Sequence, residues 1–478
     1  MRRTLMLAAL FVSAGGLFTE ASAMPMFARK LDVGCAYCHT TIPRLNETGY
    51  KFRAAGFRSP EDIGKDEVKK FELGDALSGR IQSRFDTQVT NQPNGAPISN
   101  CPGNVCGSRT TTNAFSFMEA TIYPVTGSWG KYFGSLSELS VSPEDFFEVE
   151  NAYVRIVKGD AKRFFTSRIG VFHPWEGFGA SDRPFSNART LFQTTPISAG
   201  GRAIPYVFQP WGLDEAGAEV GGDFDKLSLR AAVLGGTFLR WDGDANAFLP
   251  FPAQTGPWKG ANQAVAALGK SYSAVGHNAV DFSANATYLL HPDGGVATLL
   301  YYHGNVATPT RCTDGTAIGS TTGGVACGVS ASGVVGNTDF DFTAASAFQN
   351  NFDRLAVYGS YPIAKFLPMG GYQYGRDETP VSPSTFPANA ALTTFTSNGV
   401  FAEGAFTISD YFTAGVRYDR FHPNTEKLNT QWAITPYVNI PLNNGFQIIA
   451  EYQHRNFELD ATHDRQNDTF QVRVIFIQ

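Results

Sequence analysis

The feature that most constrains the fold of this 478-residue chain is a period-two alternation of apolar and polar residues, which recurs from about Gly74 to the C-terminus. In the clearest run, every second residue from Phe470 to Phe476 is apolar. Similar runs occur at residues 80–86, 412–419 and 446–453. An alternation of this period places the two sets of side chains on opposite faces of a β-sheet. The chain is therefore expected to be mainly β.

The connections between these runs alternate between short and long. Short turns are expected at residues 124–128, 158–161, 223–226, 291–295, 409–410 and 443–445. Long loops are expected at about 90–111, 174–213, 240–276, 305–350 and 378–395. Short turns at one end and long loops at the other are typical of an outer-membrane β-barrel. A soluble β-sandwich is the alternative, but it would not explain this asymmetry.

The number of strands follows from where the chain crosses between the two ends of the barrel. Seventeen strand-like runs can be counted, but a bacterial barrel with both termini in the periplasm needs an even number. Assigning Asp339–Phe348 to the external loop leaves 16 antiparallel strands, with 18 as the alternative. Such a barrel is wide enough for an aqueous lumen, which could hold a plug of about 50 residues. At Pro436 we expect a bulge, because proline departs from strand chemistry.

Composition excludes several other classes of protein. Only 17% of residues are charged and the formal net charge is −5, so there is no basic excess to neutralise nucleic-acid phosphates. A hydrophobic share of 43% is too high for a disordered chain. Beyond residue 23 no uncharged apolar run reaches about 18 residues, which argues against membrane-spanning helices.

The N-terminus has the pattern of a secretory signal peptide. Two arginines precede an apolar stretch from Leu5 to Phe18, and Ala21-Ser22-Ala23 forms a cleavage site of the A-x-A type. We therefore expect residues 1–23 to be removed and the mature chain to enter an oxidising compartment, where disulfides persist.

Two close cysteine pairs are expected to form disulfides that tie off surface loops. They are Cys101 with Cys106, and Cys312 with Cys327. Both pairs lie among turn residues, and neither has the additional ligands that a zinc site would need.

The third cysteine pair belongs to the motif Cys35-Ala36-Tyr37-Cys38-His39, the C-x-x-C-H pattern by which c-type haem is attached. Thiols at i and i+3 of a helical turn face the same way, so both can bond to the vinyl groups of one haem. His39 can then place an imidazole nitrogen on the iron. In a chain with 6 Cys and 8 His, about 0.001 such matches are expected by chance. A zinc knuckle or a redox C-x-x-C pair is the weaker interpretation.

The second axial ligand of such a haem is less constrained by the sequence. Methionine or histidine would serve, and Met26 is our first choice because it lies close to the motif. Met118, Met369 and His173 are alternatives that could reach the iron only from the barrel.

The segment that carries the motif differs from the rest of the chain. Residues 24–73 lack strand alternation and form a small helical domain, and residues 74–478 form the barrel. Helical segments are expected at residues 27–40, which would carry the motif, and at residues 45–55. A last solvated turn or helix is expected at residues 61–70. A domain of this size has a small core, so haem and barrel must cover much of its apolar surface.

The motif is part of a longer pattern. It comprises Ala23, Pro25, Phe27-Ala28-Arg29, Cys35, Cys38-His39, Pro43, Leu45-Asn46, Gly49, Phe52 and Gly56-Phe57. This pattern resembles the N-terminal signature of the fused monohaem cytochrome–porin family, which includes outer-membrane iron oxidases of iron-oxidising bacteria. The resemblance covers about residues 23–58, and the barrel is similar to that family only in length and pattern. It assigns Cys35, Cys38 and His39 to the haem and no residue to an iron site.

The resemblance implies an electron conduit in the bacterial outer membrane, embedded in its lipid and carrying one haem c. Electrons would come from extracellular Fe(II) and pass to a periplasmic c-type cytochrome. Such a chain would be an Fe(II)-oxidising oxidoreductase or an electron-transfer protein. Two alternatives remain open: outward transfer to extracellular acceptors, and a porin in which the haem plug is structural or sensory.

Covalent attachment has a direct consequence for the denatured protein. Because thioether bonds survive heat and detergent, the purified chain is expected to remain red on a denaturing gel and to stain for haem peroxidase activity. Loss of colour on heating would contradict attachment. Recovery of the chain among soluble periplasmic proteins would contradict the barrel.

Overall fold

The structure is a computed structural model that describes part of the chain. The described residues are 25–41, 44–65, 78–91, 109–141, 148–174, 190–191, 198–199, 202–203, 215–235, 238–242, 247–251, 280–309, 314–316, 321–322, 325–326, 347–378, 394–409, 411–422, 430–443, 445–458 and 464–477. The expected signal peptide and the four cysteines Cys101, Cys106, Cys312 and Cys327 lie outside the described residues, so the leader and both disulfides stay predictions.

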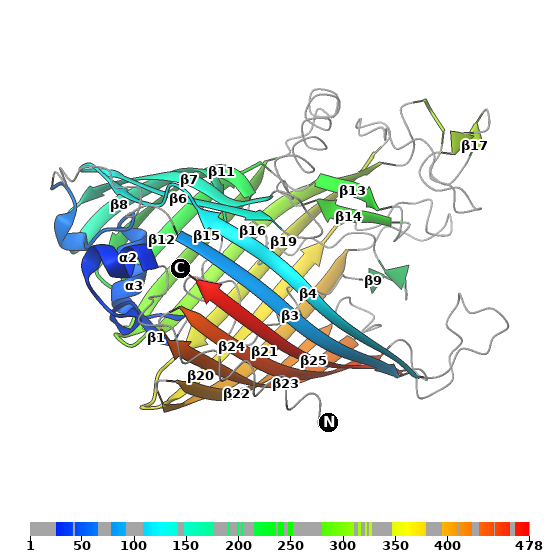
Figure 1. The fold of residues 1–478 in the computed structure, drawn as a ribbon. Helices are drawn as coiled ribbons and strands as arrows, with labels where there is room; N and C mark the ends of the chain where they lie inside the picture. Colours follow the sequence, from blue (N-terminus) through cyan, green and yellow to red (C-terminus); the bar gives the residue numbers. More distant parts are fainter. Residues whose placement is uncertain are drawn as a thin grey trace.

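Sixteen antiparallel strand positions close into a barrel (Figure 1). The strands follow one another in chain order around the ring from β3 (Ser78–Asn91), and β25 (Asp464–Ile477) closes the ring by pairing with β3. β4 (Arg109–Tyr123) and the short β5 (Gly127–Trp129) share one position, because both pair with β6 (Phe133–Val141). The expected 16-stranded antiparallel barrel is therefore confirmed.

The other strands of the ring are mostly long. They are β7 (Glu148–Gly159), β8 (Arg163–Phe172), β11 (Glu215–Phe224), β12 (Leu227–Leu234), β15 (Asp281–His291), β16 (Gly295–Pro309), β19 (Ala347–Ser360), β20 (Phe366–Asp377), β21 (Phe395–Ser409), β22 (Phe412–His422), β23 (Thr430–Asn443) and β24 (Phe446–Glu458). Small hairpins within the described ranges of the long connections are β9 (Ser198–Ala199) with β10 (Arg202–Ala203), β13 (Phe238–Asp242) with β14 (Ala247–Phe251), and β17 (Thr321–Thr322) with β18 (Val325–Ala326).

The barrel has an apolar outer face and a polar inner face. On β8, Ile169 is 67% exposed while its neighbour Arg168 is 3% exposed; on β11, Val220 is 63% exposed while Glu219 is 2% exposed. An apolar outside and a polar lumen are the properties of a barrel that spans a membrane. None of the helices in the described ranges is long and apolar enough to cross a membrane.

Tyrosines mark the two edges of the apolar band. One set occupies the seventh position of strands that begin at short turns: Tyr301 in β16, Tyr372 in β20, Tyr418 in β22 and Tyr452 in β24. All four are between 40% and 45% exposed. A second set, Tyr288, Tyr361 and Tyr411, lies at the short-turn end and is also exposed. Aromatic residues gather at both interfaces of outer-membrane barrels. The two sets are about 20 Å apart along the tilted strand.

One loop boundary differs from the sequence prediction. Ala347 and Phe348, which we assigned to the external loop, are the first residues of β19. They pair with Pro309 and Thr308 of β16, so the ladder continues beyond the expected end of both strands. The loop assignment was wrong for these two residues. Strand pairing between β16 and β19 continues beyond the part of the strands that the membrane covers.

The expected bulge at Pro436 is also wrong. Pro436 pairs with Val416 of β22 without a register shift. On the other side, pairing with β24 is interrupted between Ile434 and Tyr437 but resumes in the same register. Proline cannot donate to the ladder, so one side loses hydrogen bonds locally while the strand itself stays regular.

Residues 25–41 and 44–65, the inner segment, lie inside the end of the barrel that has the short turns (Figure 1). Its elements are α2 (Pro25–Leu31), the 3₁₀ turn η2 (Cys35–Tyr37), β1 (His39–Thr41), β2 (Arg44–Leu45), α3 (Glu47–Ala54) and the 3₁₀ turn η3 (Pro60–Asp62). Ala55 and Ile63 pack on the inward-facing Val157 and Phe164 of the barrel wall. The inner segment therefore packs against the lumen side of the barrel wall, while a haem-bearing plug stays a prediction.

Two glycines allow the backbone of the inner segment to approach β6 closely. A β-carbon at Gly134 would lie 2.4 Å from the carbonyl oxygen of Gly56 and 2.7 Å from its α-carbon. Gly56 itself has φ +69°, a conformation that favours glycine. Larger side chains at these positions would push the inner segment away from the wall.

The close contact between Gly56 and Gly134 predicts that a methyl group added at Gly134 is destabilising. Gly134→Ala should lower the free energy of unfolding by about 1–3 kcal/mol, because the added carbon overpacks a backbone contact. It should also make the inner segment more sensitive to protease. Denaturant unfolding in detergent micelles, followed by tryptophan fluorescence, measures the first effect, and limited proteolysis the second.

The matched control is Gly79→Ala in β3, where the nearest atom to an added β-carbon is 3.6 Å away. This variant should behave as the wild type. Equal stability and equal protease resistance for both variants would contradict the close packing of Gly56 on β6.

Candidate functional site

The C-x-x-C-H motif lies on a single tight turn inside the barrel. The backbone N–H of Cys38 donates to the carbonyl oxygen of Cys35 at 3.2 Å, and the N–H of Tyr37 donates to that of Gly34 at 3.0 Å. Both cysteines are half-buried, and no disulfide joins them. Burial, together with the neighbouring Cys35, raises the pKa of the Cys38 thiol above its usual value. The two thiols are thus one turn apart, and His39 follows at the start of β1.

The predicted helix over residues 27–40 is wrong, because α2 ends at Leu31. Asp32 adopts the left-handed conformation with φ 53°, and the N–H of Val33 donates to the carbonyl oxygen of Ala28 at 3.1 Å. This combination is a Schellman cap, which ends a helix. The motif therefore lies on its own 3₁₀ turn, and the i and i+3 spacing of the thiols is kept.

Asn46 connects the motif turn to the next helix. Its side-chain oxygen accepts from the N–H of Gly49 at 3.0 Å and caps α3, while its side-chain nitrogen donates to the carbonyl oxygens of Ala36 (3.3 Å) and Tyr37 (3.1 Å). Its backbone N–H donates to the carbonyl oxygen of Cys38 at 2.9 Å. The expected helix at residues 45–55 is confirmed in part, since α3 spans Glu47–Ala54.

Gly49 permits α3 to lie directly against the motif. A β-carbon there would be 2.3 Å from the carbonyl oxygen of Cys38 and 2.7 Å from Cδ2 of Leu45. Beside it, the rings of Phe27, Phe52 and Phe57 form a cluster with centroid distances of 5.1 to 6.3 Å. The turn is thus supported by an apolar core of its own.

The donor set on this turn fits a c-type haem. Two thiols separated by two residues can form two thioether bonds, and the imidazole of His39 can bind iron. Gly49 and the phenylalanine cluster hold the turn in a compact apolar setting. Cys35, Cys38 and His39 would therefore hold the group.

The candidates for the second axial ligand occupy different places. Met26 is fully buried in α2, at 0% exposure. Met369 faces the lumen from β20 and its sulfur contacts the guanidinium of Arg44. Met118 is half-buried in β4. His173 directly follows β8, and its backbone carbonyl oxygen accepts from the guanidinium of Arg168 at 3.0 Å. Met26 remains the predicted ligand.

Three buried arginines hold the inner segment against the wall. Arg58, 2% exposed, donates to the carbonyl oxygens of Gly130 (2.9 Å) and Lys131 (2.6 Å) in the connection before β6, and to that of Phe133 at the start of β6. In the opposite direction, Arg155 of β7 donates to the carbonyl oxygens at the C-terminus of α3, at 2.8 Å and 3.3 Å. A cation at this end also complements the helix dipole.

Arg44 provides the third anchor, on the far side of the barrel. Its guanidinium donates to the hydroxyl oxygen of Ser360 in β19 at 2.8 Å. Nearby, the backbone N–H of Glu47 donates to the carbonyl oxygen of Pro292 at 2.8 Å. The hydroxyl of Thr40 donates to the backbone carbonyl oxygen of Asp293 at 2.5 Å. The inner segment is therefore bound to the wall at several strands.

The sequence analysis missed these arginines, and it named Asn46 only as part of the resemblance pattern, without a structural role. Asn46 had a local signal, since asparagine before a helical run is a common N-cap. Arg58 and Arg155 had none, because their partners are backbone atoms that become neighbours only when the barrel closes.

The lumen is also occupied further along its axis. Thr190 and Leu191 are 0% and 2% exposed, and the N–H of Leu191 donates to Oδ1 of Asp419 in β22 at 3.4 Å. Thr190 and Leu191 follow β8 in the chain, yet β22 lies opposite β8 in the ring. Chain from the connection after β8 therefore reaches the far wall of the lumen.

Asp419 belongs to a buried polar group on that wall. It accepts from Nε of Arg417 at 2.6 Å, and the two side chains are 0% exposed. The hydroxyl of Tyr437 donates to Oε1 of Glu403 at 2.6 Å. Within the described ranges, no three His, Cys, Asp or Glu side chains are grouped so that they could hold a metal ion.

Comparisons with known proteins give the following results. No family model matches the sequence, and no curated protein matches it. The outer-membrane channel DcaP of Acinetobacter baumannii is 9% identical, with 84% of this chain and 96% of that chain covered and a TM-score of 0.45. OprB of Pseudomonas putida is 9% identical, with 84% and 94% covered and a TM-score of 0.45. A loop-deletion mutant of OmpT, an outer-membrane protein of Vibrio cholerae, is 10% identical, with 84% and 100% covered and a TM-score of 0.44.

The position of Met26 leads to a test of the second ligand. Met26→Leu keeps nearly the same buried volume but removes the sulfur, so the visible spectrum of the haem-loaded protein should change while the fold is retained. Met369→Leu is the matched control and should leave the spectrum unchanged. If Met26→Leu left the spectrum unchanged and Met369→Leu changed it, the second axial ligand would be Met369 on the barrel wall and not Met26.

Proposed function

We propose that this chain is an outer-membrane electron conduit, in which a haem c inside a porin-like barrel takes electrons from extracellular Fe(II). The electrons would pass to a periplasmic c-type cytochrome. A haem iron that alternates between its ferrous and ferric states carries one electron at a time. The resemblance of residues 23–58 to the fused monohaem cytochrome–porin family supports this proposal.

The observation that carries the proposal is the location of the motif. Cys35 and Cys38 lie on one turn, and His39 directly follows it. The segment that carries them packs inside a closed barrel, at the end with the short turns. In outer-membrane barrels the short turns face the periplasm. A redox group held there would be positioned to pass electrons to a soluble periplasmic partner.

The chain's own residues would bind and shield the group. Asn46 and Gly49 keep α3 against the motif turn, and Arg58 and Arg155 keep the inner segment seated in the barrel. A fixed position matters because electron transfer between redox groups depends steeply on their separation.

The direction of electron flow follows from the chemistry of iron. Fe(II) is soluble and its oxide is not, so oxidation at the cell surface keeps solid out of the periplasm. Methionine and histidine ligation tends to raise the haem potential, and a high potential favours taking electrons from Fe(II). A strongly negative potential would instead favour outward transfer to an extracellular acceptor.

A porin with a structural or sensory haem plug is the remaining candidate. It is favoured by the barrel itself, since 16 strands enclose a lumen. The inner segment and the contact of Leu191 with Asp419 weigh against a wide open channel. Single-channel conductance in a planar bilayer separates these possibilities.

The proposal predicts rapid reduction of the oxidised protein by Fe(II). Stopped-flow mixing of the purified, haem-loaded chain with Fe(II) should show haem reduction that becomes faster as the Fe(II) concentration rises. The reason is that the acceptor is already bound and only collision with the donor is required. The absorbance of the haem measures this directly.

Two comparisons make this test specific. Lys162→Gln, on the exposed turn between β7 and β8 and outside the inner segment, should react like the wild type. Cys35→Ser combined with Cys38→Ser should yield a barrel without covalent haem and without the signal. If wild-type haem stays oxidised across a range of pH and Fe(II) concentration, Fe(II) is not the donor.

A further inference from the structure

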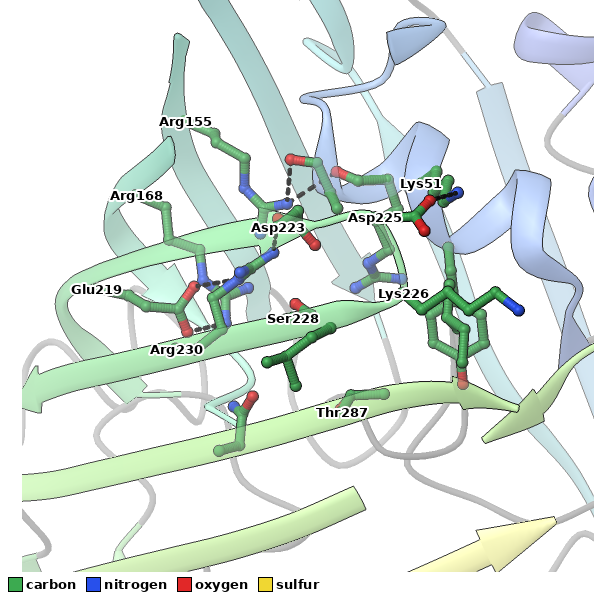
Figure 2. Close-up of a pocket in the computed structure, with 16 residues that line it drawn as sticks. Lys51, Arg155, Arg168, Glu219, Asp223, Asp225, Lys226, Ser228, Arg230 and Thr287 are labelled. Carbon is green, nitrogen blue, oxygen red and sulfur yellow. Dashed lines mark hydrogen bonds and ion pairs between the residues drawn. The ribbon is translucent and has the colours of Figure 1, made fainter. Parts of the chain in front are cut away.

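A cavity of about 70 Å³ lies between α3 of the inner segment and the barrel wall (Figure 2). Its lining comes from α3, from β7, β8, β11, β12 and β15, and from the short turn between β11 and β12. Lys51 and Asp225 lie at one side of it, and Arg168, Glu219 and Arg230 at the other (Figure 2). The cavity is separate from the motif turn, which packs on the Gly49 side of α3.

Positive charge predominates in this lining. The cationic residues are Lys51, Arg53, Arg155, Arg168, Lys226 and Arg230, and the anionic residues are Glu219, Asp223 and Asp225. Glu47, just outside the lining, accepts from Lys51 at 2.6 Å. When Lys51 is left out because Glu47 neutralises it, five cationic residues face three anionic residues in the lining. Asp225, whose side chain is 70% exposed, contributes least to the buried field.

The arginines on the wall are close together and deeply buried. Arg155 of β7 and Arg168 of β8 are directly opposite in the strand register, and are 2% and 3% exposed. Like charges in directly opposed positions destabilise a sheet unless negative charge lies nearby. Glu219 accepts from Arg168 at 2.7 Å, and Asp223 accepts from Arg230 at 2.6 Å.

Glu219 has to balance more than one of these arginines. Its second oxygen is 3.8 Å from Nε of Arg230, while Arg155 faces the carbonyl oxygens at the end of α3. The end of a helix carries only about half a negative charge. The buried part of the lining, three arginines with two carboxylates, therefore keeps a positive potential.

We propose that this cavity binds a small inorganic oxyanion, of the size and charge of phosphate or sulfate. Guanidinium groups bind such anions through paired, charge-assisted hydrogen bonds. The cavity is large enough for about five waters or one tetrahedral anion. Lys226 and Asp225 are exposed, so the ligand enters from the short-turn end of the lumen.

The bound anion would also stabilise the contact between α3 and the barrel wall. Arg155 lines the cavity and donates to the carbonyl oxygens of Arg53 and Ala54. An anion that attracts Arg155, Arg168 and Arg230 at once relieves their mutual repulsion and fixes the position of the wall arginine that caps α3. This site does not depend on the haem or on the proposed electron transfer.

Isothermal titration calorimetry of the full chain in detergent micelles tests the proposal. Sodium phosphate is titrated in one arm and sodium sulfate in another, with sodium chloride of equal ionic strength as the reference, because screening alone changes surface electrostatics. Both oxyanions should give saturable binding of one ion per chain, and chloride should not. Arg230→Gln should weaken phosphate binding about tenfold, since it removes one charge-assisted pair.

Two further variants keep the test independent of folding defects. Lys226→Gln removes an exposed cation at the entrance and should weaken phosphate binding about threefold, as expected for a partly screened charge. Lys162→Gln, on the neighbouring turn and outside the cavity lining, should bind phosphate like the wild type. Phosphate heats equal to those of chloride, or equal affinity in the wild type and Lys226→Gln, would overturn the proposal.

Discussion

Hydrogen bonds between buried arginines and backbone carbonyl oxygens hold the inner segment inside the barrel, and the candidate site depends on them. Arg58 reaches from the inner segment to the connection before β6, and Arg155 reaches from β7 to the end of α3. A guanidinium group has five donors in a rigid plane, so a single side chain can satisfy several carbonyl oxygens. Buried carbonyl groups need such partners. The small inner segment is therefore stabilised by its contacts with the barrel wall.

The barrel was predictable because its signals are local. Alternation places apolar residues such as Ile169 and Val220 on the outer face and Arg168 and Glu219 on the inner face. Turn lengths then give the order and number of strands, since neighbours in the chain are neighbours in the ring. The C-x-x-C-H motif is equally local, and its spacing is kept on η2 although the surrounding helix is shorter than expected.

What the sequence did not reveal depends on distant parts of the chain. The contact of Gly56 with Gly134 and the cap on α3 exist only after the ring has closed. The extra residue pairs at the start of β19 and the regular strand around Pro436 also depend on pairing with neighbouring strands. The cavity beside α3 is set by the register of five strands, so no single stretch of sequence could indicate it.

The central claim is that electrons cross the membrane through this chain, which transport in a sealed vesicle tests most directly. The haem-loaded protein would be reconstituted in proteoliposomes with a soluble c-type cytochrome inside and Fe(II) outside. We predict that the enclosed cytochrome becomes reduced, and that vesicles with the Cys35→Ser, Cys38→Ser variant leave it oxidised. An enclosed cytochrome that stays oxidised, while the haem of the barrel is reduced from outside, would contradict the account.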